Sequence, residues 1–176
     1  MKIRTSLAAA VLAVGLASPA LAQNKPYVEM NYGFSSVSDS RDYQHGFTLR
    51  GGNDFGPIRA EVAMNHNFMS QNAGGGNGNL NTTTLSGHLY LEKTFGKTTP
   101  FVGLGVGNMW ADGTGTARNS SIVGIVSTGL AYALTEKVSL VGRYDYTMSA
   151  DPLVINGGNP DRLKSHSFMA GARLSF

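Results

Sequence analysis

Apolar and polar residues alternate one by one in eight segments of the chain, and helical periodicity is absent from the residues after the first twenty-two. Successive side chains of a β-strand point to opposite faces of its sheet, so each segment predicts a strand with one apolar and one polar face. The predicted strands span residues 27–34, 43–52, 58–68, 84–95, 101–110, 126–134, 138–147 and 166–176. The sixth strand has the weakest pattern, because both of its faces are apolar near its start.

The connections between these strands alternate in length. The tight turns cover residues 53–57, 96–99 and 135–137. The longer, polar connections cover residues 35–42, 69–83, 111–121 and 149–163. Outer-membrane barrels combine short periplasmic turns with longer external loops in this way. The predicted fold is therefore all-β, an eight-stranded antiparallel up-and-down transmembrane β-barrel with both chain ends at the short-turn end.

The charged residues separate the two faces of the predicted strands. Of nine charged strand residues only Lys93 lies on the apolar face, close to a strand end. The other eight lie on the polar face and are four acids and four arginines: Glu29, Arg50, Arg59, Glu61, Glu92, Arg143, Asp145 and Arg173. An unpaired buried charge costs several kcal/mol, so these residues are predicted to pair or to bind water. We favour an ion-pair network that plugs the lumen; the alternative is a narrow gate whose pairs break to pass small solutes.

Three features favour a polar face turned inward and an apolar face turned toward lipid. Small residues crowd the polar face, and they fit the narrow lumen of eight strands. Strands of about 10 to 13 residues are long enough to cross the hydrocarbon layer at a tilt. Aromatic residues gather near both strand ends, as in membrane-interface girdles: Phe34, Tyr43, Phe68, Trp110, Tyr146 and Phe168 at one end, Phe55, Phe95, Tyr132 and Phe176 at the other. The alternative is a soluble lipocalin-like carrier with its apolar face lining a ligand cavity.

The first residues predict a secretory signal peptide. Met1–Arg4 is positively charged, Leu7–Leu16 is apolar, and Ala20-Leu21-Ala22 matches a cleavage signature. Ten apolar residues are too few for a membrane-spanning helix. We therefore expect a signal peptide over residues 1–22, cleavage after Ala22, and a barrel domain over residues 23–176, located in the outer membrane of a Gram-negative bacterium.

Composition excludes several other functions. The chain contains no cysteine, which excludes a disulfide framework, a thiolate zinc site, an iron–sulfur cluster and a lipoprotein anchor. Residues 23–176 carry 12 basic and 11 acidic side chains, a net charge of +1. Nucleic-acid binding requires a dense basic stripe, so no nucleic-acid partner is expected. No cofactor and no metal site is predicted.

Three segments carry motifs that resemble a known family. Residues 100–107 have the spacing P-F-x-G-x-G-x-G, and residues 129–135 have the spacing G-x-x-Y-x-L-T, followed by Arg143-Tyr144-Asp145-Tyr146. The last strand ends in an alternating apolar series: Phe168, Ala170, Ala172, Leu174 and Phe176. These motifs resemble the small outer-membrane β-barrel family of porin-like, opacity-type barrels, which is related to the eight-stranded barrel of outer-membrane protein A.

The resemblance implies a structural or surface-interaction role in envelope integrity, with adhesion as a further possibility. It implies that the last strand is an assembly signal for the barrel-assembly machinery. Outer-membrane lipid and lipopolysaccharide are the implied partners, together with a host or surface ligand at the loops. A narrow porin is the alternative role. No catalytic residue is predicted, so the protein is not expected to be an enzyme.

A lipid A-modifying enzyme is a minor alternative. The lipid A deacylases among small outer-membrane barrels resemble one another in a His-x-Ser pair on a late strand. Of His45, His66, His88 and His166, none is followed two residues later by a serine. Ser165 and Ser167 flank His166 directly, so on a strand they would point away from it.

The glycines at positions 103, 105 and 107 also have two interpretations. They could be mistaken for a dinucleotide-binding loop, but they lie inside a predicted strand and no helix follows them. We instead expect a smooth inner stripe against which neighbouring side chains pack.

Overall fold

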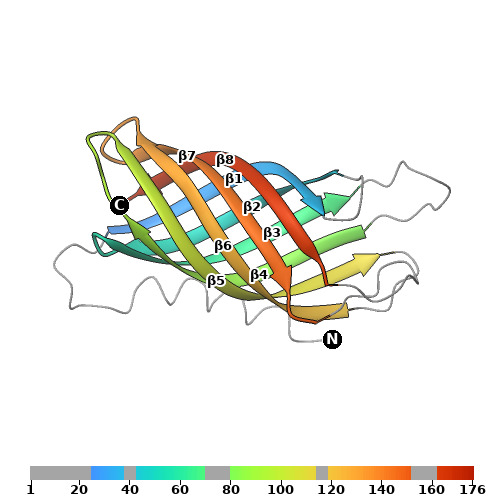
Figure 1. The fold of residues 1–176 in the computed structure, drawn as a ribbon. Helices are drawn as coiled ribbons and strands as arrows, with labels where there is room; N and C mark the ends of the chain where they lie inside the picture. The colour runs from blue at the N-terminus through green and yellow to red at the C-terminus, as the bar shows by residue number, and fades with distance from the viewer. Residues whose placement is uncertain (1–24, 38–42, 70–79, 114–118, 152–161) are drawn as a thin grey trace.

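A computed structural model of the chain describes residues 25–37, 43–69, 80–113, 119–151 and 162–176 (Figure 1). The predicted signal peptide, residues 1–22, lies outside the described residues. The eight strands are β1 (Lys25–Val37), β2 (Tyr43–Asp54), β3 (Ile58–Met69), β4 (Leu80–Glu92), β5 (Thr98–Gly113), β6 (Asn119–Ala133), β7 (Val138–Ser149) and β8 (Lys164–Ser175).

The strands form one closed antiparallel barrel. Each strand pairs with its neighbours in the sequence, and β1 pairs with β8 to close the ring. At this seam Tyr27 lies opposite Ser175, and the backbone N–H of Phe176 donates to the carbonyl oxygen of Pro26 at 2.9 Å. Closure leaves no unpaired sheet edge, as a barrel within a lipid bilayer requires. The predicted fold class is confirmed.

The two ends of the barrel differ, as the connection lengths predict. The short turns, residues 55–57, 93–97 and 134–137, all lie at one end, which we call the short-turn end (Figure 1). Local hydrogen bonds fix two of them. The Asp54 carboxylate accepts from the backbone N–H of Gly56 at 2.7 Å, and the hydroxyl of Thr135 accepts from the N–H of Val138 at 3.0 Å.

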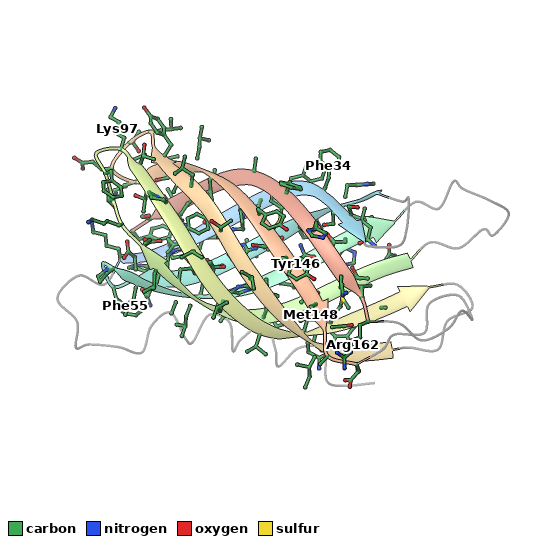
Figure 2. All side chains as sticks on the ribbon, viewed as in Figure 1. Phe34, Phe55, Lys97, Tyr146, Met148 and Arg162 are labelled. Atoms are coloured by element: carbon green, nitrogen blue, oxygen red, sulfur yellow. The ribbon has the colours of Figure 1, made fainter. Side chains whose placement is uncertain are left out.

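Burial alternates along every strand and identifies the two faces. Polar side chains point into the lumen, where Glu29 and Arg59 are 0% exposed. Apolar side chains cover the outside, where Leu104 is 67% and Phe168 is 64% exposed. Figure 2 shows side chains projecting outward from the ribbon, among them the labelled Phe34. The lipocalin-like alternative, with its apolar face inside, is therefore wrong.

The bounds of three strands, β4, β5 and β6, differ most from the sequence prediction. β4 ends at Glu92, because Phe95 and Thr98 pair across the following turn, where Gly96 has a φ of 62°. β5 and β6 are longer than predicted, and β6 begins at Asn119 rather than at residue 126. On the early part of β6 the lumen-facing residues are themselves apolar. Val123 and Ile125 pack against Met109 and Leu163 inside the barrel, so the alternation disappears there.

Candidate functional site

Seven of the eight charged strand residues lie in the half of the lumen nearer the short turns, and the eighth, Asp145, lies farther along β7. Their side chains are at most 8% exposed. They come from six of the eight strands: Glu29 from β1, Arg50 from β2, Arg59 and Glu61 from β3, Glu92 from β4, Arg143 and Asp145 from β7, and Arg173 from β8. We call this set the lumen charge cluster.

Glu61 lies at the centre of the lumen charge cluster. Arginines from three strands donate to its carboxylate: Arg50 at 2.6 Å, Arg59 at 2.8 Å and Arg143 at 3.3 Å. Two phenol groups also donate to it, from Tyr27 at 2.6 Å and Tyr90 at 2.8 Å. One carboxylate therefore connects β1, β2, β3, β4 and β7 across the lumen. Charge-assisted hydrogen bonds of this kind are among the strongest in proteins.

The remaining three acids also bind arginines of the lumen charge cluster. Glu29 accepts from Arg143 at 3.0 Å and from Arg173 at 2.9 Å. Asp145 accepts from Arg50 at 2.8 Å, which continues the cluster toward the long-connection end. Glu92 accepts from Arg59 at 2.6 Å, which continues it toward the short turns. Each of the four acids thus contacts at least one arginine.

Aromatic rings cover three of the four arginine side chains that these acids bind. The Arg59 guanidinium lies 4.2 Å from the ring centre of Tyr90 and 4.9 Å from that of Phe101. The Arg143 guanidinium lies 5.1 Å and 5.0 Å from the same two rings. Arg173 lies 4.6 Å from the Tyr27 ring. A planar guanidinium can stack on a ring and still donate from its edge, which explains why arginine rather than lysine occupies these positions.

The glycines of β5 make room for the side chains of β4. Gly103, Gly105 and Gly107 lie opposite Tyr90, His88 and Ser86, respectively. A Cβ atom on Gly103 would lie 2.3 Å from the Tyr90 ring, and one on Gly105 would lie 2.4 Å from the His88 ring. The expected glycine stripe against which neighbouring side chains pack is confirmed, and it lies inside a strand.

A polar cavity of about 50 Å³ lies in the other half of the lumen. Hydroxyl and amide side chains form most of its wall, and Met109, Ile125, Leu163 and Met169 contribute an apolar side. Arg50, His88 and Asp145 also line it, and each has a buried nitrogen or oxygen without a hydrogen-bond partner among the described residues. A cavity of this size and polarity fits a few water molecules.

The four histidines occupy two kinds of position. His45, His66 and His166 lie on the outer face, where His66 bonds Thr83 at 2.9 Å and His166 bonds the Tyr144 hydroxyl at 2.7 Å. His88 lies in the lumen, 2.8 Å from the Ser86 hydroxyl. Ser165 and Ser167 are buried, on the face of β8 opposite to His166, as the strand geometry predicts.

The Ser86–His88 contact was missed by the sequence analysis. The motif considered there places the serine two residues after the histidine, whereas this serine comes two residues before it. The other ring nitrogen of His88 has no hydrogen-bond partner among the described residues, so no third group orients the pair. The pair also faces the small lumen cavity rather than the lipid.

The described residues bear on two further possibilities, a membrane-spanning helix and a metal site. They contain no helix long and apolar enough to cross a membrane. In the same part of the chain, no three histidine or acidic side chains are grouped so that they could hold a metal ion.

Comparison with known proteins identifies the family. The sequence profile of the family described as "Outer membrane protein beta-barrel domain" matches residues 6–176, nearly the whole chain. The chain belongs to this outer-membrane β-barrel family. Membership implies the bacterial outer membrane and agrees with the closed barrel and its apolar outer face. No curated protein sequence matches the chain.

Three solved structures of similar barrels show the range of roles on this fold. Neisserial surface protein A is 19% identical, with a TM-score of 0.63, and the match covers 87% of this chain and 97% of that one. Ail, the attachment invasion locus protein of Yersinia pestis, in complex with the heparin analogue sucrose octasulfate, is 15% identical, with a TM-score of 0.62 and coverages of 88% and 99%. The outer membrane enzyme PagL is 12% identical, with a TM-score of 0.55 and coverages of 83% and 98%. At these identities the three structures support the fold alone.

Proposed function

We propose that this chain is an exported structural barrel of the outer membrane whose lumen is plugged by the lumen charge cluster, and whose external loops contact a surface ligand. The observation that carries the proposal is the position of Glu61. Its carboxylate accepts from three arginines and two tyrosines that come from five strands, so side chains fill the cross-section at this level. Such a network holds the strands together and leaves no continuous path for solute.

Export and assembly complete the proposal. A signal peptide over residues 1–22, cleaved after Ala22, would deliver the barrel domain, residues 23–176, to the periplasm. The outward apolar series of β8 would then serve as the signal for the barrel-assembly machinery: Phe168, Ala170, Ala172, Leu174 and Phe176. All five side chains face outward in the structure and are exposed, which is where a recognition series must lie.

A surface ligand at the loops is proposed by analogy with one similar barrel. Ail carries a sulfated heparin analogue in its structure. By analogy we propose that the loops of this chain also contact a surface ligand, and that lipopolysaccharide surrounds the external end of the barrel.

A narrow pore is the second candidate, and one observation favours it. The polar cavity extends the lumen from the long-connection end down to Arg50 and Asp145. If the ion pair between Arg50 and Asp145 opened, the water-filled part of the lumen would lengthen toward the short-turn end. Below it, however, Arg50 remains bound to Glu61 at 2.6 Å, so opening the outer pair alone leaves the central contacts in place.

Conductance in a planar bilayer decides between plug and pore. The wild-type barrel is expected to be silent, and Asp145→Ala should be silent as well, because Glu61 still holds Arg50. Asp151→Ala, an exposed acid at the same end of the barrel, is the matched control. Stable stepwise openings of the wild-type protein would refute the plug and establish the pore.

A catalytic role is tested separately. We propose that the chain is not an enzyme, although PagL shows that the fold can carry one. The lipid A of cells with and without this protein should have the same acyl pattern by mass spectrometry. A missing or added acyl chain that depends on the protein would overturn this part of the proposal, and Ser86→Ala would then test the lumen pair.

A further inference from the structure

The short-turn end carries a concentration of lysines that the plug does not use. Its four lysines are Lys25 at the start of β1, Lys93 and Lys97 in the β4–β5 turn, and Lys137 in the β6–β7 turn. All four side chains are exposed. Figure 2 shows Lys97 at this end, with Met148 and Arg162 at the opposite end of the barrel.

Backbone hydrogen bonds connect the segments that carry these lysines into one arc of the rim. The carbonyl of Lys97 accepts from Ala133, at the end of β6, at 2.8 Å. The carbonyl of Lys137 accepts from Ser175, at the end of β8, at 2.8 Å. Next to it Phe176 bonds Pro26, the neighbour of Lys25. We call the four lysines on this continuous stretch of rim, from β4 round to β1, the basic arc.

The charge of the rim is polarised rather than balanced. Among the described residues of the basic arc the only exposed acidic side chain is that of Glu136, because Glu92 at the end of β4 points inward and binds Arg59. The remaining short turn, between β2 and β3, has no lysine, and its acid, Asp54, is bonded to Gly56 of that turn. At the opposite end of the barrel the described residues include two acids and two basic residues: Asp112, Asp151, Arg162 and Lys164.

Exposed apolar side chains lie directly beside the basic arc. Phe95 is 59%, Tyr132 is 45% and Phe176 is 68% exposed, and all three belong to the apolar outer face. The Lys93 ammonium lies 5.3 Å from the centre of the Phe95 ring, so its aliphatic stem follows the apolar surface while its charge stays at the rim. A cation held at the boundary of an apolar belt sits at the depth of lipid headgroups.

We propose that the basic arc binds the phosphate groups of anionic phospholipids in the leaflet that surrounds the short-turn end. Each lysine ammonium is a point charge on a flexible stem and suits a phosphate that itself moves. Basic residues close to an anionic membrane surface each contribute favourably to binding, and the attraction falls off within a Debye length. Because the arc covers only part of the rim, anionic lipid gathers next to β4–β8 and β1 rather than next to β2 and β3.

The test measures lipid selectivity of the full-length barrel in a bilayer. The protein is reconstituted in phosphatidylcholine with a trace of spin-labelled phosphatidylglycerol or spin-labelled phosphatidylcholine. At low salt the wild type should prefer the anionic probe by about threefold or more, and the preference should shrink at high salt. Replacing all four lysines, Lys25→Gln, Lys93→Gln, Lys97→Gln and Lys137→Gln, should bring the ratio close to one.

Two controls separate charge at this rim from charge in general. Lys164→Gln removes an exposed lysine at the opposite end and should leave the ratio unchanged. Changing all four lysines of the arc to arginine keeps the charge and should preserve the preference. If the fourfold glutamine variant does not fold, the pairs Lys93→Gln with Lys97→Gln and Lys25→Gln with Lys137→Gln should each remove part of the preference.

The inference relies on the outer-membrane location but not on the plug. Heat-modifiability on a gel reports folding, and conductance reports the plug, so failure of either is visible independently of lipid selectivity. A ratio near one for the folded wild type, or an unchanged ratio for the folded glutamine variants, overturns the proposal. Salt-sensitive binding of polyglutamate without lipid preference would instead assign the arc to an acidic protein partner.

Discussion

Removing the negative charge of Glu61 should destabilise the barrel more than any other single change of charge. In Glu61→Gln the side chain keeps its size, but three arginines lose their shared carboxylate. The new amide group is itself a donor and faces the donors of Tyr27 and Arg59, which now bond one oxygen of Glu61. Removing one partner of a buried ion pair costs about 3–5 kcal/mol, because the remaining charges stay buried without compensation.

The free energy of unfolding can be measured by urea titration of the barrel in lipid vesicles. The fluorescence of the single tryptophan, Trp110, and the gel shift between folded and unfolded protein supply two independent signals. Glu136→Gln is the matched control, since Glu136 is an exposed turn residue whose replacement should change stability by less than about 0.5 kcal/mol. A loss below about 1 kcal/mol for Glu61→Gln would falsify the argument that this carboxylate holds the lumen together.

Three further predictions address the glycine stripe, the stacked arginines and assembly. Gly103→Ala should lower the free energy of unfolding by about 1–3 kcal/mol in the same titration, because its Cβ would lie 2.3 Å from the Tyr90 ring. The control is Gly87→Ala on the outer face, whose Cβ would meet nothing within 4 Å and which should be nearly neutral. Arg59→Lys should lower the free energy of unfolding by about 2 kcal/mol, because lysine cannot stack on the buried Tyr90 ring as the guanidinium does. A loss as small as that of Glu136→Gln would argue against this stacking. Phe176→Ala should slow assembly by purified barrel-assembly machinery and leave the folded barrel intact; unchanged kinetics would remove Phe176 from the proposed signal.

The two-residue period was sufficient to predict the barrel and its faces. Leu89 and Leu91 alternate with His88 and Tyr90, and the structure exposes the first pair and buries the second. Besides the displaced ends of β4 and β5, the pattern failed where apolar residues point into the lumen. Val123 and Ile125 are apolar residues inside the lumen, so the first half of β6 looks apolar on both faces.

The sequence alone does not predict which charged residues pair inside the lumen. Alternation predicts that Glu61 points inward, but its partners Arg50 and Arg143 lie on β2 and β7, and their distance depends on strand stagger and barrel tilt. The basic arc is different. Lys25 and Lys97 are far apart in the sequence, but the predicted topology already places both at the short-turn end, and the hydrogen bonds between neighbouring strand ends add which segments of the rim lie side by side.

The seam between β1 and β8 has a consequence for the direction of the chain. Phe176 already bonds Pro26, so a short linker between the two strands would join them without disturbing any pair. The joined barrel could then be reopened at residues 55–57, which would make β3 the first strand of a circular permutant. All eight strand pairings would survive, because the order of strands round the ring is cyclic. The equilibrium stability of the barrel therefore does not determine which strand is synthesised last. The requirements of export and insertion determine it.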